Sequence, residues 1–198
     1  SQTVGNLIRN PAVWLFALIL SYIGQAEASV SLWGTIYLQK MFAYDPVTQG
    51  ATFLSAFFLL FTLARLVSGI FIEKIGYAKT IYISLVATII TLLLGFSLME
   101  GGIWILAVSG FFISIIWPAI LAIMTRAFGG SVPVAISIAT TISGINSILL
   151  QLFTGYLGQL LGAEWGYRLS LLYAVISTVL FFALMIHFRR KKIYCDAV

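Results

Sequence analysis

A glutamate inside a long apolar stretch is the residue with the clearest chemical potential in this sequence. Glu27 lies near the middle of the apolar segment 12–38. A carboxylate in hydrocarbon costs at least ~2.5 kcal/mol on insertion scales unless it faces a cavity, a partner or a bound proton. Glu27 is therefore a candidate for binding a solute or a proton, and the alternative is a packing glutamate bonded to a hydroxyl or a tryptophan N–H.

Further polar and aromatic side chains in this segment fall on a different face. Gln25, Ser29 and Trp33 recur every four residues, and Tyr22 precedes Gln25 by three, which are the spacings of one helix face. An amide, a hydroxyl and an aromatic ring suit a sugar-like ligand, although generic polar contacts use the same groups. A helix that is polar on two faces is expected to be central rather than lipid-exposed. The full set of predicted substrate-binding residues is Tyr22, Gln25, Glu27, Ser29, Trp33, Trp117, Asn146 and Gln151.

Two later segments carry the remaining candidates. Asn146 and Gln151 lie in segment 132–158, where small residues at steps of four favour tight helix packing. Trp117 is followed by Pro118, which frees a backbone carbonyl within segment 103–125. Arg65 lies about two turns before the end of segment 49–73, so we favour snorkelling to the interface over binding of a substrate anion.

The composition shows which elements must position these residues. The chain has 198 residues, of which 61% are hydrophobic and 9% charged, against about 25% charged in an ordinary soluble domain. Apolar runs of about 20 residues suffice for a helix to cross a bilayer. We therefore predict an all-α membrane protein with six transmembrane helices at 12–38, 49–73, 78–99, 103–125, 132–158 and 166–188, between a linker (1–11) and a basic tail (189–198).

The distribution of basic residues predicts the topology. One side carries Arg9, Lys74, Lys79, Arg126 and the four basic residues of 189–192, whereas the other carries Lys40 and Arg168. The positive-inside rule places both termini in the cytoplasm of a multi-pass protein of the cell membrane (inner or plasma). The net charge of +5 then reflects membrane orientation, and no nucleic-acid partner is expected.

The second and fifth predicted helices end in similar sequences. A hydroxyl residue followed by glycine, Ser68-Gly69 and Thr154-Gly155, recurs with an offset of 86 residues, and so does the glycine that follows each pair, Gly76 and Gly162. With three helices between the copies, the pattern predicts a 3+3 inverted repeat. The first glycine of each copy is expected to permit close helix approach, and the last to occupy the left-handed position that ends a helix.

The loop after the second helix resembles a signature of the major facilitator superfamily. Its residues are Gly69, Glu73, Lys74, Gly76 and Lys79, with glutamate where aspartate is more usual. The stretch Asn10-Pro11-Ala-Val-Trp14 resembles the entry to the seventh helix of that superfamily. Two further stretches resemble its fucose/proton symporter-like branch, namely Tyr22-Ile-Gly24-Gln25-Ala-Glu27 with Trp33 and Tyr37-Leu38, and Trp117-Pro118-Ala-Ile.

This resemblance implies the C-terminal six-helix half of a secondary active transporter that works by alternating access. Its solute would be a sugar or another small polar organic molecule, with a coupled proton, and Gly69, Glu73, Lys74, Gly76 and Lys79 would form a gating motif. The expected partners are membrane lipid and the missing N-terminal half or a second copy. The alternative is a half-size subunit, or a channel-like or structural six-helix protein, working as a dimer.

An enzyme is not expected from this sequence. The single histidine, His187, has no metal-ligand partner at helical spacing, and no Gly-x-Ser-x-Gly elbow occurs. We predict neither a metal site nor a cofactor. Because the sequence starts with Ser1 and no signal peptide pattern follows, we expect a piece of a longer protein or a processed product.

Overall fold

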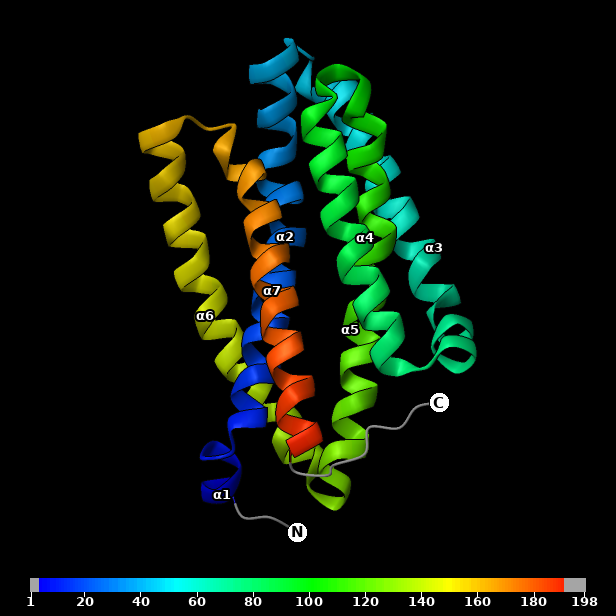
Figure 1. Cartoon of the computed structure of the whole chain (residues 1–198). Coiled ribbons are helices and arrows are strands. Elements are labelled where there is room, and N and C mark those ends of the chain that lie inside the picture. The colour runs from blue at the N-terminus through cyan, green and yellow to red at the C-terminus, as the bar shows by residue number, and fades with distance from the viewer. Residues whose placement is uncertain (1–3, 191–198) are drawn as a thin grey trace.

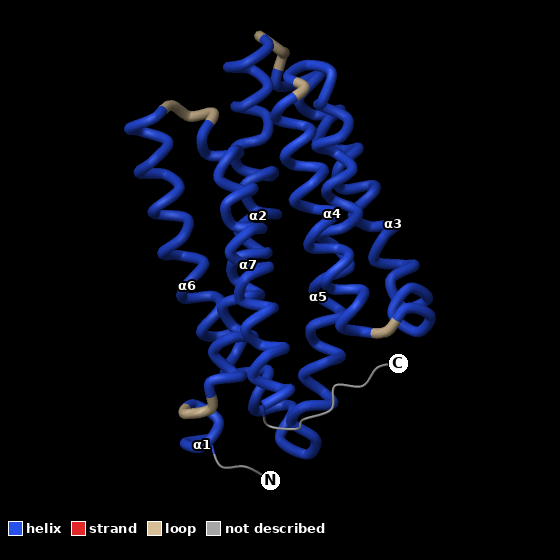
Figure 2. The backbone as a smooth tube through the Cα atoms, viewed as in Figure 1, coloured by secondary structure: helices blue, strands red, loops and turns tan. Residues whose placement is uncertain are grey.

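The computed structural model describes residues 4–190, and all of their regular structure is helical (Figure 2). Six long helices account for most of it: α2 (Pro11–Phe42), α3 (Ala51–Ile75), α4 (Tyr77–Ser97), α5 (Ile103–Phe128), α6 (Val132–Leu161) and α7 (Trp165–Arg190). A short helix α1 (Val4–Ile8), the π-type turn η1 (Pro46–Gly50) and the 3-10 turns η2 (Met99–Gly102) and η3 (Gly129–Ser131) complete it. The predicted linker thus contains a helical turn, and the predicted tail beyond Arg190 lies outside the described residues.

Five continuous segments among residues 4–190 are long and apolar enough to cross a membrane. They are Pro11–Phe42, Pro46–Ile75, Tyr77–Ser97, Met99–Leu161 and Trp165–Arg190. The fourth is 63 residues long because helical turns join α5 and α6 without interruption. A multi-pass membrane protein is therefore compatible with both the length and the composition of these helices.

The long helices alternate in direction along the chain (Figure 1). α2 runs away from the end of the molecule at which the described chain both begins and ends, and each following helix reverses. We call this the terminal end and the opposite one the distal end. α4 and α7 lie toward the viewer in Figure 1, while α3 and α6 form the two flanks.

Helix packing forms two linked groups. α2 packs on α7 and α6, α5 packs on α4 and α3, and α4 and α7 join the groups across the middle. Glycines permit the closest approaches within the second group. A Cβ at Gly102 would lie closer than 3.0 Å to the backbone of Gly95, and one at Gly110 would meet Phe57 in α3 in the same way.

Backbone conformation at two glycines fixes where α3 and α6 end. Gly76 has φ 95° and ψ 153°, and Gly162 has φ 113° and ψ 146°. Their N–H groups donate to the carbonyls of Ile72 and Gly158, at 2.9 and 3.2 Å. The predicted positive φ is present, but ψ near 150° belongs to a region that essentially only glycine adopts, rather than to the left-handed helical one.

Candidate functional site

Four polar side chains join α2 to α6 in what we call the amide seam, which consists of Ser21, Gln25, Asn146 and Gln151. The Gln25 amide Nε2 donates to Oε1 of Gln151, and Nδ2 of Asn146 donates to the Ser21 hydroxyl at 2.7 Å. α2 and α6 run in the same direction (Figure 1), so the order of the two contacts is the same along both helices. Three of the predicted binding residues are therefore brought together here, and each amide has a partner inside the protein.

The amide seam continues toward α7 through hydroxyl groups. The hydroxyls of Thr154 and Tyr173 form a buried hydrogen bond between α6 and α7. The Tyr22 ring lies 6.1 Å from that of Tyr173, centroid to centroid. Tyr22, a predicted binding residue, thus borders this polar layer as a half-buried aromatic side chain.

Ser29 and Trp33, predicted to share a binding face with Gln25, make packing contacts. Ser29 is buried and donates to the backbone carbonyl of Gln25 at 2.9 Å, a local bond by which a hydroxyl is satisfied inside a helix. The Trp33 ring lies so close to α7 that a Cβ at Gly166 would come nearer than 3.0 Å to it. Its buried Nε1 has no hydrogen-bond partner among the described residues.

Glu27 lies on another side of α2 and interacts with Arg65 of α3. The interaction between the two charges is coulombic, and no ion pair or hydrogen bond joins either charged group to another described residue. Arg65 also places its guanidinium 4.7 Å from the centre of the Phe61 ring. The structure therefore adds Arg65, which the sequence assigned to snorkelling, to the surroundings of Glu27.

Trp117 stands apart from both groups. It is half-buried and packs against the hydrophobic core from α5, and no hydrogen bond or ring contact joins it to the amide seam within residues 4–190. The neighbouring Ser114 hydroxyl is buried without a hydrogen-bond partner in the described part of the chain. The structure does not bring Trp117 together with Gln25 or Gln151.

The predicted gating motif spans the turn between α3 and α4 at the terminal end. Glu73 and Lys74 are exposed in the last turn of α3, and Lys79 is exposed in the first turn of α4. Gly69 is exposed, and no other described helix comes within 4 Å of the point where its Cβ would be. The predicted close approach at Gly69 is thus not made within residues 4–190, and the same is true of Gly155.

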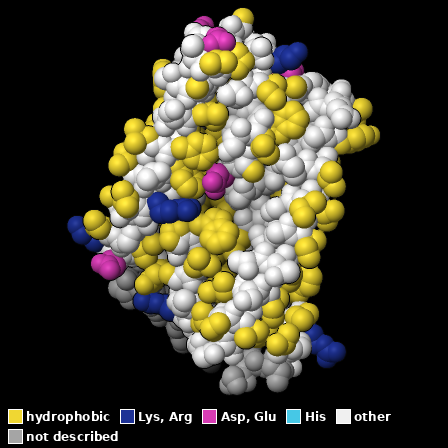
Figure 3. All heavy atoms as spheres, turned by 180° about the vertical axis from the view of Figure 1, so that it is seen from behind, with side chains coloured by type: hydrophobic (Ala, Val, Ile, Leu, Met, Phe, Trp, Pro, Cys, Tyr) yellow, Lys and Arg dark blue, Asp and Glu magenta, His cyan; other side chains and the backbone are white. Residues whose placement is uncertain are grey.

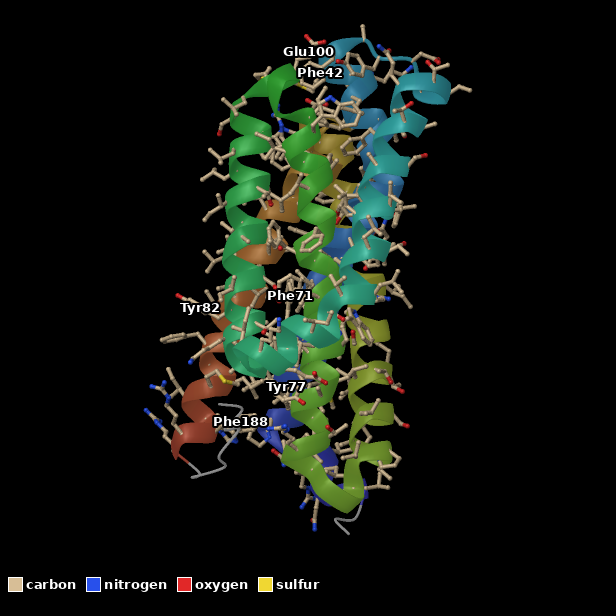
Figure 4. All side chains as sticks on the ribbon, turned by 90° about the vertical axis from the view of Figure 1, so that its right-hand side faces the viewer. Phe42, Phe71, Tyr77, Tyr82, Glu100 and Phe188 are labelled. Carbon is tan, nitrogen blue, oxygen red and sulfur yellow. The ribbon has the colours of Figure 1, made fainter. Side chains whose placement is uncertain are left out.

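At the distal end, hydrogen bonds order the loop between α2 and α3. The Tyr44 hydroxyl donates to Glu100 at 2.8 Å, which raises the Tyr44 pKa, and Glu100 lies near Phe42 at this end (Figure 4). The Thr48 hydroxyl and backbone N–H both donate to the Asp45 carboxylate, at 2.6 and 2.8 Å. These bonds favour the charged form and lower the Asp45 pKa.

The sequence did not single out Ser21, Thr154 or Tyr173 as site residues. Thr154 was noticed for its repeat with Ser68, but its contact with Tyr173 depends on how α6 and α7 are rotated against each other. A polar residue within an apolar span was the available signal, because such residues face protein rather than lipid.

No group of three or more metal-ligating side chains forms within residues 4–190. Comparison with protein-family models, curated proteins and solved structures finds no match to this chain.

Proposed function

We propose that this chain is one six-helix unit of a secondary active transporter of the major facilitator type, which moves a small polar organic solute, such as a sugar, by alternating access. In this proposal all six long helices cross the membrane, as two inverted groups of three, and both termini lie in the cytoplasm. A second six-helix unit, from the same protein or a second copy, completes the solute pathway.

The pattern of helix packing is the observation that carries the proposal. Exchanging α2 with α5, α3 with α6 and α4 with α7 turns each major helix contact into another contact that is present. The pair α2–α7 becomes α5–α4, the pair α2–α6 becomes α5–α3, and α4–α7 maps onto itself. Because α2 and α5 run in opposite directions (Figure 1), the exchange inverts the unit, as expected of an inverted repeat.

Burial of individual residues follows the same exchange. Of the six buried positions in α3, five are buried again 86 residues later in α6: Phe53, Phe57, Ala64, Ser68 and Ile72 correspond to Ala139, Ser143, Leu150, Thr154 and Gly158. With an offset of 90 residues, eleven of the thirteen buried positions in α5 correspond to buried positions in α2. Gly76 and Gly162, which share an uncommon backbone conformation, obey the 86-residue offset as well.

Charge at the two ends supports the proposed orientation. Among the described residues, the terminal end carries Arg9, Lys74, Lys79, Arg126, Arg189 and Arg190, and the distal end carries Lys40 and Arg168. The larger number of basic residues marks the cytoplasmic side of a membrane protein with short loops.

Open space at Gly69 and Gly155 supports a second unit. Both glycines interrupt faces of α3 and α6 that are rich in exposed apolar side chains, such as Leu66 and Leu152. Small residues on such faces let another helix approach closely in a membrane.

Solute exchange in proteoliposomes tests the proposal. The complete transporter that contains this chain is reconstituted, and uptake of labelled hexoses, polyols and neutral amino acids is followed with and without an inward proton gradient. We expect saturable uptake that is accelerated by unlabelled solute on the opposite side, and stimulation by the gradient indicates a coupled proton. Flux that rises linearly with concentration and shows no counterflow indicates a channel, whereas no flux for any class indicates a structural protein, and either result overturns the proposal.

A pair of glycine variants tests the second unit. Gly69→Leu adds bulk at a position where no described atom beyond the local backbone lies within 4 Å, and so does Gly101→Leu in the turn between α4 and α5. We expect Gly69→Leu to reduce transport about tenfold while the thermal stability of the isolated chain stays unchanged. Gly101→Leu serves as the matched control, and equal transport by both variants contradicts a partner at Gly69.

A further inference from the structure

Two opposite charges lie at the same depth on neighbouring helices. Glu27 precedes the last residue of α2 by 15 positions, and Arg65 follows the first residue of α3 by 14. At 1.5 Å per residue, both lie about 22 Å from the distal end of their helices. They are the only charged residues of the described long helices that stand more than two turns from both helix ends.

Both charged side chains can be reached from outside this chain. Figure 3 shows the molecule from the side opposite to Figure 1, where charged groups are few and are surrounded by apolar and neutral groups. Glu27 is half-buried and Arg65 is exposed, so molecules outside this chain can reach them.

Neither charge is neutralised by a direct contact. The coulombic interaction of Glu27 with Arg65 shows that the two groups share one electrostatic environment, yet no hydrogen bond or ion pair joins them. In the amide seam, by contrast, the Gln25 side chain is paired with that of Gln151. Charged groups at membrane depth are retained where a ligand, an ion or a partner compensates them.

From this arrangement we infer that Glu27 and Arg65 form a binding site for a small zwitterion, such as a neutral α-amino acid. The Glu27 carboxylate accepts hydrogen bonds from the ammonium group, and the Arg65 guanidinium donates to the carboxylate, a geometry in which arginine excels. This inference rests on the proposed transport function and specifies its substrate class.

Charge balance favours a zwitterion over a polyol. A hydroxyl can hydrogen-bond to both side chains, but it leaves the two protein charges without opposite charges of the solute. A zwitterion compensates each charge separately and brings no net charge. The site is electroneutral when empty and when occupied, so neither reorientation of the transporter moves charge through the membrane potential.

Counterflow with matched solutes and variants tests the inference. Proteoliposomes of the complete transporter are loaded in turn with L-alanine or L-glutamine, with a hexose or polyol, and with the singly charged analogues ethylamine and propionate. We expect counterflow for the amino acids and at least tenfold less for the analogues. Glu27→Gln and Arg65→Gln should each lower amino-acid counterflow about 100-fold, because a charged partner is lost.

Three further measurements distinguish loss of solute binding from misfolding and from general charge effects. Glu164→Gln and Arg189→Gln remove one carboxylate and one guanidinium near helix ends, and they should retain native counterflow. Thermal unfolding in detergent should show that the Glu27 and Arg65 variants are folded, and the double exchange Glu27→Arg with Arg65→Glu should recover part of the binding.

The outcomes separate the two proposals. Counterflow of hexoses or polyols alone, or amino-acid counterflow that survives both neutralisations, overturns the zwitterion site and leaves the transport function standing. Absence of counterflow for all solute classes overturns the transport function itself.

Discussion

The polar side chains on the two sides of helix α2 differ in whether they have hydrogen-bond partners inside the chain. On the side of α6, Gln25 and Ser21 are hydrogen-bonded to Gln151 and Asn146. On the side of α3, Glu27 interacts with Arg65 only through space. Polar groups that find partners inside the chain hold helices together, whereas charges without such partners are available to a ligand. The difference separates structural from functional candidates among residues that look alike in sequence.

The largest effect on stability is expected at Gly166 of α7, which packs tightly against Trp33 of α2. Gly166→Ala drives a methyl group into the Trp33 ring, and overpacking of this kind typically costs about 1–3 kcal/mol. Thermal unfolding in detergent measures the change. Gly144→Ala is the control because its Cβ meets no atom within 4 Å, and Trp33→Leu should rescue Gly166→Ala. An unchanged melting temperature in Gly166→Ala would show that the α2–α7 contact is not fixed.

A double-mutant cycle tests the amide seam directly. Gln25→Leu and Gln151→Leu each remove one partner of the hydrogen bond, and we expect a coupling free energy of about 1 kcal/mol, in the range found for polar pairs between membrane helices. Gln159→Leu, at an exposed position of the same helix, should show no coupling to Gln25→Leu. Zero coupling between Gln25 and Gln151 would remove the distinction between the two sides of α2.

Neutralising Glu27 should change the free energy of unfolding in the opposite direction to the amide-seam substitutions. Glu27→Gln removes a charge that has no direct partner in the chain, so we expect the free energy of unfolding to stay equal or rise by up to about 1 kcal/mol. Unfolding in the same detergent as the seam variants makes the comparison like for like. A loss of more than about 1 kcal/mol would instead place Glu27 among the packing residues.

The smallest effect is expected for Asp45, a solvent-exposed carboxylate in the loop between α2 and α3. Hydrogen bonds from Thr48 lower the Asp45 pKa, so their stabilisation is present above the unfolded pKa and is lost as pH falls through the lowered folded value. Asp45→Asn should reduce hydrogen-exchange protection at the Thr48 amide near neutral pH, and the difference from native protein should vanish in acid. A difference that is independent of pH would show that ionisation of Asp45 does not matter.

The helices themselves could be predicted from the sequence. Predicted spans such as 103–125 and 132–158 correspond to Ile103–Phe128 and Val132–Leu161, because apolar length and bordering glycines act locally. Six separate spans were predicted, whereas five continuous segments qualify by length and composition, since the turn between α5 and α6 keeps helical geometry. The π-type turn Pro46–Gly50 was also missed, because its conformation depends on contacts with α2 and α3.

The site was predictable only in part, for a physical reason. Spacing shows which residues share a helix face, and it grouped Gln25 with Ser29 and Trp33. It does not show which neighbouring helix that face meets, so the partner of Gln25 and the separate position of Trp117 required the assembled structure. Arg65 was assigned to the interface from its distance along one helix, and its relation to Glu27 involves two helices.

Both ends of the described chain lie at one end of the bundle, and this has a consequence for how such a unit can be duplicated genetically. With the six membrane crossings proposed above, a tandem copy can be joined by a linker that stays on a single side of the membrane, with no additional hydrophobic segment. The two copies then insert with the same polarity and are related by an axis normal to the bilayer. A unit with an odd number of crossings could not be doubled in this way without turning one copy upside down.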